Sequence, residues 1–88
     1  MAEQNGLVKK EVMGYGRVKV KLSRVMDEQG ITRNRLKELI DGNYNVITRY
    51  YKGEDVQMVD LDFLARVCCV LHCEIADLLE YVPEEALD

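Results

Sequence analysis

Two short apolar periods, separated by a few turn-forming residues, constrain the fold of this chain more than any other feature. Both lie in the stretch ITRNRLKELIDGNYNVITRYYKG, residues 31–53. Each period has the i, i+3, i+4 spacing of one helical face. The apolar residues are Leu36, Leu39 and Ile40 in the first period and Ile47, Tyr50 and Tyr51 in the second. The stretch therefore predicts two short helices, each with one buried side.

Residues typical of helix ends flank both predicted helices. Thr32 and Asn43 each carry a side-chain oxygen that can accept an N–H bond from the first turn of a helix. Asp41, Gly42 and Asn43 are residues that turns favour, and Gly53 is placed to end the second helix. Two helices joined in this way form a helix-turn-helix, whose second helix has a suitable size to enter the major groove of DNA.

Three further helices are predicted outside this stretch, which makes the chain an all-α domain of five helices. One spans residues 21–29 and ends at Gly30, a second is capped by Asp60 and runs to about residue 71, and a third spans residues 74–80. Their inward faces are expected to hold Leu22, Val25, Met26, Leu61, Leu64, Val67, Cys68, Leu71, Ile75, Leu78 and Leu79.

A strictly alternating segment, RVKVK at residues 17–21, predicts one short strand with a basic outer face. An isolated strand needs a partner, and the plausible one is residues 79–82, within one subunit or between two. The expected organisation is a flexible N-terminal lead-in over 1–16, one helix-turn-helix domain over 17–83 and an acidic tail over 84–88.

The charge of the chain is divided unevenly between its two parts. The net charge is −4, but residues 1–53 hold 11 Lys and Arg against 6 Asp and Glu, a balance of +5. Residues 54–88 hold only Arg66 against 10 acids, a balance of −9. Affinity for phosphate depends on the local patch, so the basic part permits a nucleic-acid partner. The alternative is a solvated surface with unevenly placed charges.

Several classes of protein are disfavoured by the sequence. Three cysteines within six residues make no disulfide framework and suit a reducing compartment. With no apolar run of about 20 residues and no signal-peptide core, we expect a cytoplasmic chain without a membrane partner. The single histidine, His72, has no nucleophile motif around it, so we expect no enzyme, no cofactor and no small-molecule ligand.

Three segments carry a family resemblance: KLSRVMDEQGITRNRLKELI, NYNVITRYYKGE and VDLDFLARVCCVLHCEIADLLEYVPEE. Their motifs are T-x-x-x-L at the start of one helix, N-x-I-x-R followed by G-E in the next, and the closing DLLEY. Together these segments, roughly residues 17 to 85, resemble the Cro-type, lambda-repressor-like helix-turn-helix regulators, also called the XRE family. The resemblance implies a five-helix DNA-binding domain.

Two positions depart from the pattern of that family. Lys37 stands where a small residue is usual, because the two helices cross closely there, and Asp41 stands where the turn usually has glycine. A lysine side chain can extend outward to solvent, and aspartate tolerates a left-handed backbone better than most residues. We therefore expect the helix-turn-helix to form.

The resemblance also assigns the residues that would contact DNA. The base-contacting residues would be Tyr44, Asn45, Thr48 and Arg49. Asn can bond adenine and Arg can bond guanine through two hydrogen bonds each. The phosphate-contacting residues would be Thr32, Arg33, Arg35, Asn43 and Lys52, which position the protein without reading sequence. The alternative is a polar helix face that binds nothing.

The predicted function is a sequence-specific transcriptional regulator, expected to be a repressor, that binds double-stranded DNA as a homodimer. One helix reads too few base pairs for specificity, so a dimer on a two-fold site is expected. One alternative is an interaction module of the same fold, antitoxin-like or anti-regulator, working through its acidic C-terminal half. A third is a metal or redox sensor using Cys69, His72 and Cys73, at helical spacing, although structural zinc needs four ligands.

Overall fold

The computed structural model describes residues 14–54 and 56–86. Its elements, in chain order, are β1 (Arg17–Val20), α2 (Leu22–Gln29), α3 (Arg33–Ile40), α4 (Tyr44–Lys52), α5 (Leu61–Leu71), α6 (Ile75–Leu78), β2 (Leu79–Val82) and the 3-10 helix η1 (Glu84–Ala86). This order confirms the predicted all-α domain of five helices with one strand pair. Most of the predicted lead-in, residues 1–13, lies outside the described residues. None of the described helices is long and apolar enough to cross a bilayer.

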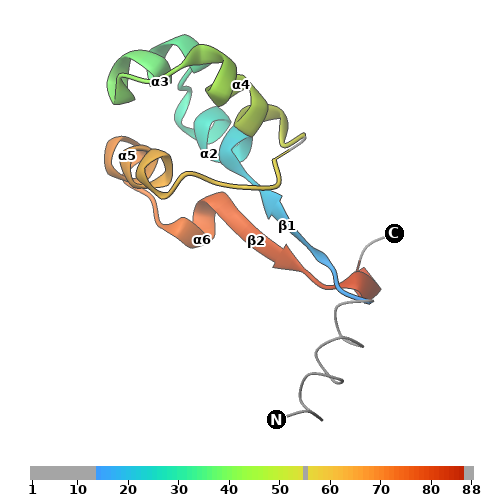
Figure 1. Cartoon of the computed structure of the whole chain (residues 1–88). Coiled ribbons are helices and arrows are strands. Elements are labelled where there is room, and N and C mark those ends of the chain that lie inside the picture. The colour runs from blue at the N-terminus through green and yellow to red at the C-terminus, as the bar shows by residue number, and fades with distance from the viewer. Residues whose placement is uncertain (1–13, 55, 87–88) are drawn as a thin grey trace.

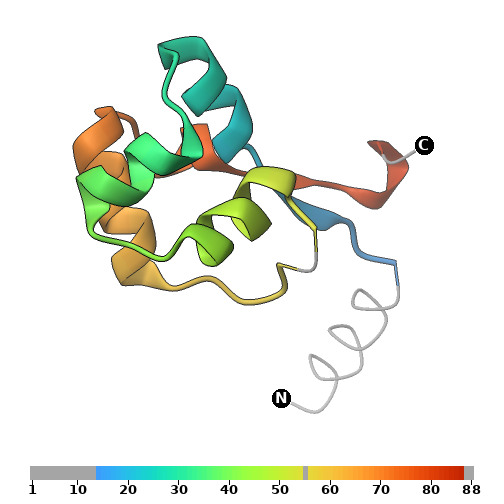
Figure 2. The same ribbon diagram turned by 90° about the horizontal axis from the view of Figure 1, so that it is seen from above.

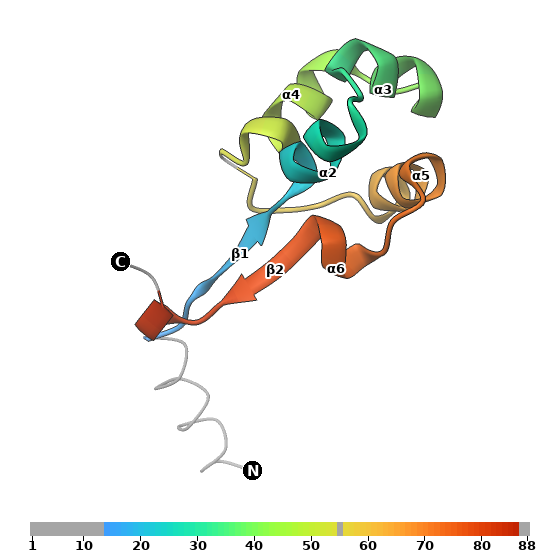
Figure 3. The same ribbon diagram turned by 180° about the vertical axis from the view of Figure 1, so that it is seen from behind.

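The helices form one body from which the two strands project as a ribbon (Figure 1). Helices α3 and α4 lie together at one end, α5 and α6 lie at the other, and α2 contacts α4, α5 and α6. The view from behind shows the ribbon leaving the body on the side away from α3 (Figure 3). Seen from above, the helices surround a common centre (Figure 2).

All five helices contribute side chains to one core. The buried residues are Leu22, Val25, Met26, Leu36, Ile40, Ile47, Tyr50, Leu64, Val67, Leu71 and Leu78. The ring of Phe63, which the sequence analysis did not place in the core, packs on Tyr50 with 4.3 Å between ring centroids. The core therefore fixes α3 and α4 from beneath and leaves their outer faces free of packing.

Some residues predicted to be inward are not buried. Leu39, Leu61 and Ile75 are exposed, at 38%, 77% and 49% of their surface. Tyr51, Cys68 and Leu79 are half-buried. Leu61 and Ile75 are exposed because they are the first residues of α5 and α6 and lie at the edge of the core. The predicted helix over 74–80 was also too long, since the chain leaves α6 at Leu78 and extends into β2.

The ribbon joins segments that are distant in sequence. β1 and β2 pair antiparallel within the subunit, with Arg17 opposite Val82 and Val20 opposite Leu79. At the outer end, the N–H of Gly16 donates to Tyr81 Oη at 3.3 Å. Val20 and Leu79 pack against the core, whereas Val18 and Tyr81 are 56% and 60% exposed. The ribbon thus anchors at one end on the helices and extends beyond them at the other.

Candidate nucleic-acid interface

Side-chain caps hold the starts of α3 and α4. Thr32 Oγ1 accepts a bond from the backbone N–H of Arg35 at 3.1 Å, which begins α3. Asn43 Oδ1 accepts bonds from the N–H groups of Asn45 and Val46, at 2.8 and 3.1 Å, which begins α4. Both predicted caps are confirmed. Because each cap removes unsatisfied donors from a helix start, it fixes where the helix begins.

The helix-turn-helix accommodates the two positions that depart from the family pattern, Lys37 in α3 and Asp41 in the turn. Asp41 adopts a left-handed backbone with φ 53°, the conformation that glycine usually supplies, and its N–H donates to the carbonyl of Lys37. The side chain of Lys37 is exposed, as expected for an outward lysine. Gly53, at φ 68°, ends α4. The sequence therefore forms a helix-turn-helix from α3, residues 41–43 and α4.

One face of α4 presents three exposed polar side chains. Asn45, Arg49 and Lys52 follow the spacing i, i+4, i+7, so they line one side of the helix. Tyr44 beside them is 37% exposed. Of the four predicted base-contacting residues, Tyr44, Asn45 and Arg49 are therefore accessible, while Thr48 is half-buried.

Thr48 is engaged by Arg33, the first residue of α3, whose side chain reaches α4. Nη1 of Arg33 donates to Thr48 Oγ1 at 3.3 Å. The guanidinium carbon lies 5.5 Å from the centre of the Tyr44 ring and 5.2 Å from that of Tyr51. Both distances suit cation–π attraction. Sequence reasoning placed Arg33 on phosphate and missed these contacts. Their only signal was the i, i+4, i+7 spacing of Tyr44, Thr48 and Tyr51.

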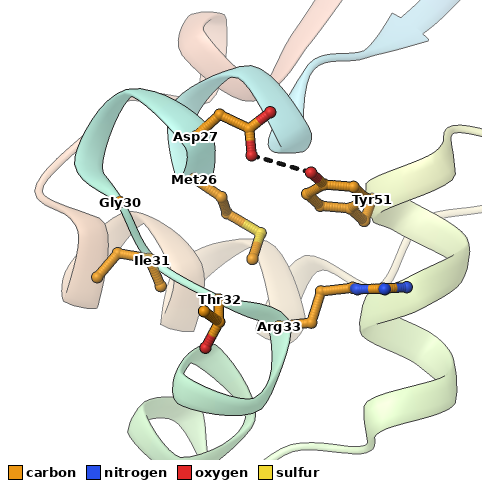
Figure 4. A pocket seen from close by; sticks show the side chains of 7 residues that line it. All are labelled: Met26, Asp27, Gly30, Ile31, Thr32, Arg33 and Tyr51. Atoms are coloured by element: carbon orange, nitrogen blue, oxygen red, sulfur yellow. Dashed lines mark hydrogen bonds between the residues drawn. The ribbon is translucent and has the colours of Figure 1, made fainter.

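A second contact joins α4 to α2. Tyr51 Oη donates to Asp27 Oδ1 at 2.9 Å (Figure 4). This hydrogen bond raises the pKa of Tyr51, with desolvation and the charge of Asp27 acting in the same direction and Arg33 opposing them. The bond lies at an open hollow lined by Met26, Asp27, Gly30, Ile31, Thr32, Arg33 and Tyr51. Side chains from α2, α3 and α4 therefore meet at this hollow.

The other predicted phosphate-contacting residues lie at the ends of the two helices. Thr32 and Asn43 are exposed at the starts of the two helices, and Lys52 is exposed near the end of α4. Arg35 is exposed and forms an i, i+3 ion pair with Glu38, 3.4 Å from Nη1 to Oε1. Exposed pairs of this kind are weak, so Arg35 can exchange Glu38 for phosphate at small cost.

The cysteine cluster does not have the geometry that a shared metal site requires. Helix α5 ends at Leu71, and His72 takes a left-handed backbone at φ 52°, which breaks the helical spacing of Cys69, His72 and Cys73. Cys69 is exposed, while Cys68 and Cys73 are half-buried. Burial, with the neighbouring Cys68 thiol, raises the pKa of Cys73 from 9.0 to about 11. Among the described residues, no group of three potential ligands is close enough to hold a metal ion.

A family model for the Cro/C1-type helix-turn-helix DNA-binding domain matches residues 21–84. This chain belongs to that family. The match includes all five described helices and β2, and it begins directly after β1. The protein is therefore a Cro/C1-type DNA-binding domain, and its family is one of DNA-binding proteins rather than enzymes.

Two solved structures resemble this Cro/C1-type domain. One is a protein from Bacteroides fragilis described as a candidate DNA-binding protein, with a TM-score of 0.63 and 22% identity, covering 73% of this chain and 100% of its own. The other is the transcriptional regulator VanUg, with a TM-score of 0.61 and 25% identity, covering 81% of this chain and 91% of its own. A search of curated proteins gave no match.

Proposed function

We propose that this domain is a sequence-specific transcriptional regulator that places α4 in the major groove of DNA. The observation that carries the proposal is the exposed row of Asn45, Arg49 and Lys52 on a helix capped at both ends. The similarity to VanUg, which is named a transcriptional regulator, supports a regulatory role. We infer repression, because occupying a promoter is sufficient to block transcription, whereas activation needs a further contact with the transcription machinery.

In this proposal α4 reads bases with four residues. Asn45 bonds the edge of an adenine and Arg49 bonds O6 and N7 of a guanine, each contributing about 1–3 kcal/mol of discrimination. Tyr44 lies at the start of the same helix, where its ring can touch a thymine methyl group. Thr48 lies between these residues and the Arg33 guanidinium, so its hydroxyl has a protein partner at 3.3 Å before any base approaches.

Phosphate contacts would come from Thr32, Arg35, Asn43 and Lys52, at the ends of the two helices. Arg33, which the resemblance also assigns to phosphate, already contacts Thr48, Tyr44 and Tyr51 of α4. The first amides of α3 and α4 add to them, because the N-terminus of a helix attracts anions. We propose residues 17–83 as the DNA-binding unit, preceded by the lead-in over 1–16 and followed by the acidic tail over 84–88.

A homodimer on a two-fold symmetric site completes the proposal. A single recognition helix contacts few base pairs, and dimers read two half-sites about 34 Å apart, one turn of DNA. The ribbon supplies one exposed apolar surface for such an assembly, since Val18 and Tyr81 lie beyond the core. A dimer would therefore gain both specificity and cover for this surface.

The test is a fluorescence-anisotropy titration with randomised duplex DNA at two salt concentrations, followed by selection of the bound sequences. We expect a steep salt dependence and an enriched palindromic motif. Arg49→Ala should weaken binding and relax preference at one position of each half-site. Arg24→Ala on α2, whose arginine is exposed and paired with Glu28 at 3.5 Å, is the matched control and should bind as the original protein does.

A second candidate is the interaction module, favoured by the acidic balance of −9 over residues 54–88. The same titration separates the two functions. Absence of binding at low salt would refute the regulator proposal and direct the search to basic protein partners of the acidic half.

A further inference from the structure

We propose that Arg33 acts as a positioning residue, which sets the base preference of α4 through its contacts with that helix. The inference rests on the proposed function, because it concerns how α4 reads DNA. It replaces the role in phosphate binding that the sequence suggests for this arginine. The evidence is the set of contacts around the guanidinium and a second contact that ties α4 to α2.

The guanidinium of Arg33 contacts three side chains that form one stripe along α4. Tyr44, Thr48 and Tyr51 stand at i, i+4 and i+7, so their side chains follow one another along the helix. The guanidinium carbon lies 5.5 Å from the centre of the Tyr44 ring and 5.2 Å from that of the Tyr51 ring, at nearly equal distances from the two. Arg33 is therefore held midway between two aromatic rings, with the Thr48 hydroxyl as its hydrogen-bond partner.

The Tyr51 ring is itself held from the opposite side. Its hydroxyl donates to Asp27 on α2 at 2.9 Å, so the ring cannot turn away from Arg33 without losing this bond (Figure 4). In Figure 4 the Arg33 side chain reaches from α3 toward α4 beneath the Tyr51 ring. Three helices are thereby linked through polar contacts that lie outside the apolar core.

The stripe held by Arg33 neighbours the face that would read bases. Successive residues of an α-helix are about 100° apart, and Asn45, Arg49 and Lys52 each follow a residue of the stripe by one position. A small rotation of α4 about its axis therefore moves the proposed reading face relative to the groove. Paired hydrogen bonds to a base edge tolerate little displacement, so the rotation set by Arg33 should decide which bases are preferred.

The experiment compares Arg33→Gln with Arg35→Gln, an exposed arginine on the same helix. We expect Arg33→Gln to lose about tenfold or more in affinity for the original site, to select a changed motif, and to keep the original salt dependence. Arg35→Gln should keep the motif and lower the slope of log affinity against log salt by about 0.9, the value for one phosphate contact. An unchanged motif with a lowered slope for Arg33→Gln would overturn the inference and restore the phosphate role.

Arg33→Lys provides the second test, which keeps the positive charge. Lysine binds phosphate well but lacks the planar guanidinium that stacks between rings. We expect Arg33→Lys to select a changed motif, as Arg33→Gln does. Selection of the same motif as the original protein would contradict the inference.

The contact itself can be measured without DNA. We expect Arg33→Gln and Tyr51→Leu to lower Tm by amounts that do not add in the double variant, because each removes the same contact. Additive losses would overturn the inference even if α4 binds DNA. Failure of the original protein to bind any DNA would instead refute the proposed function, so the two failures are distinguishable.

Discussion

At the scale of single residues, Asp41 occupies a position that suits glycine better. Its φ of 53° lies in the left-handed region, where a side chain costs about 1–2 kcal/mol. Glycine would remove this cost but add unfolded-state entropy worth about 0.4–1 kcal/mol. We expect Asp41→Gly to raise the free energy of unfolding by up to about 1 kcal/mol, measured by urea denaturation.

Gly53 gives the matched comparison for this prediction. It ends α4 at φ 68° and already has the residue type that the conformation favours. Gly53→Ala should therefore lower stability, by about 1 kcal/mol. A loss of stability in Asp41→Gly would show that the aspartate side chain contributes more to the turn than its backbone conformation costs.

The thiol of Cys73 should make the stability of the protein depend on pH. Burial raises its pKa from 9.0 to about 11 in the folded protein, so folding favours the protonated thiol. This contribution is fully present below pH 9 and is lost as the pH rises through 11. We expect Tm to fall over this range, and to fall less in Cys73→Ala than in Cys69→Ala, because Cys69 is exposed. Equal slopes for the two variants would contradict the prediction.

At the scale of helices and strands, the cap of α4 makes the clearest prediction. Asn43→Ala removes the acceptor of two backbone N–H bonds, at 2.8 and 3.1 Å, which should cost about 1 kcal/mol of stability. The exposed Asn34, the second residue of α3, provides the control. Asn34→Ala should not destabilise, since alanine has the highest helix propensity. Urea denaturation of both variants measures the difference, and equal stabilities would exclude a capping role.

The elements differ in how far the sequence could predict them. α3 and α4 were predictable because Thr32, Asn43 and Gly53 mark their ends by local chemistry. Leu79 was ambiguous, because the same residue suits the end of a helix or the start of a strand, and its pairing with Val20 decides between them. Leu61 has the correct spacing for burial, yet periodicity does not say where the core ends along a helix.

The candidate site, too, could be predicted only in part from the sequence. The exposure of Asn45 and Arg49 follows from the apolar side of α4, so the pattern could predict it. The engagement of Arg33 depends on the angle at which α3 crosses α4, which is set by packing across the whole core. Sequence reasoning could therefore identify the exposed face of α4 but not the contacts that orient it.

At the scale of the whole molecule, the outer end of the ribbon depends on one buried glycine, Gly16. A Cβ at Gly16 would lie 1.8 Å from the carbonyl oxygen of Val82 and 2.6 Å from Cα of Pro83. Because these are backbone atoms, Gly16→Ala must displace the end of β2. We expect a loss of about 1–3 kcal/mol and faster hydrogen exchange in β1 and β2, with α4 unchanged.

Gly14→Ala is the control for the ribbon. There an added Cβ would meet the flexible side chain of Glu84, whose Oε2 lies 2.9 Å away and can move aside. Its exchange rates and stability should stay close to those of the original protein. Unaltered strand exchange in Gly16→Ala would mean that the ribbon can open locally without loss.

The pairing of β1 with β2 also affects the order in which contacts form during folding. Arg17 and Val82 are paired across almost the whole domain, whereas α3 contacts α4 across a turn of three residues. Contacts between distant parts of a chain form slowly, because the loop between them must first lose its freedom. During synthesis, β1 leaves the ribosome long before β2, so its backbone hydrogen-bonding groups stay unpaired until β2 is made. The alternating Arg17 and Lys19 of β1 would keep this unpaired strand soluble through the interval, since charged edge strands resist aggregation.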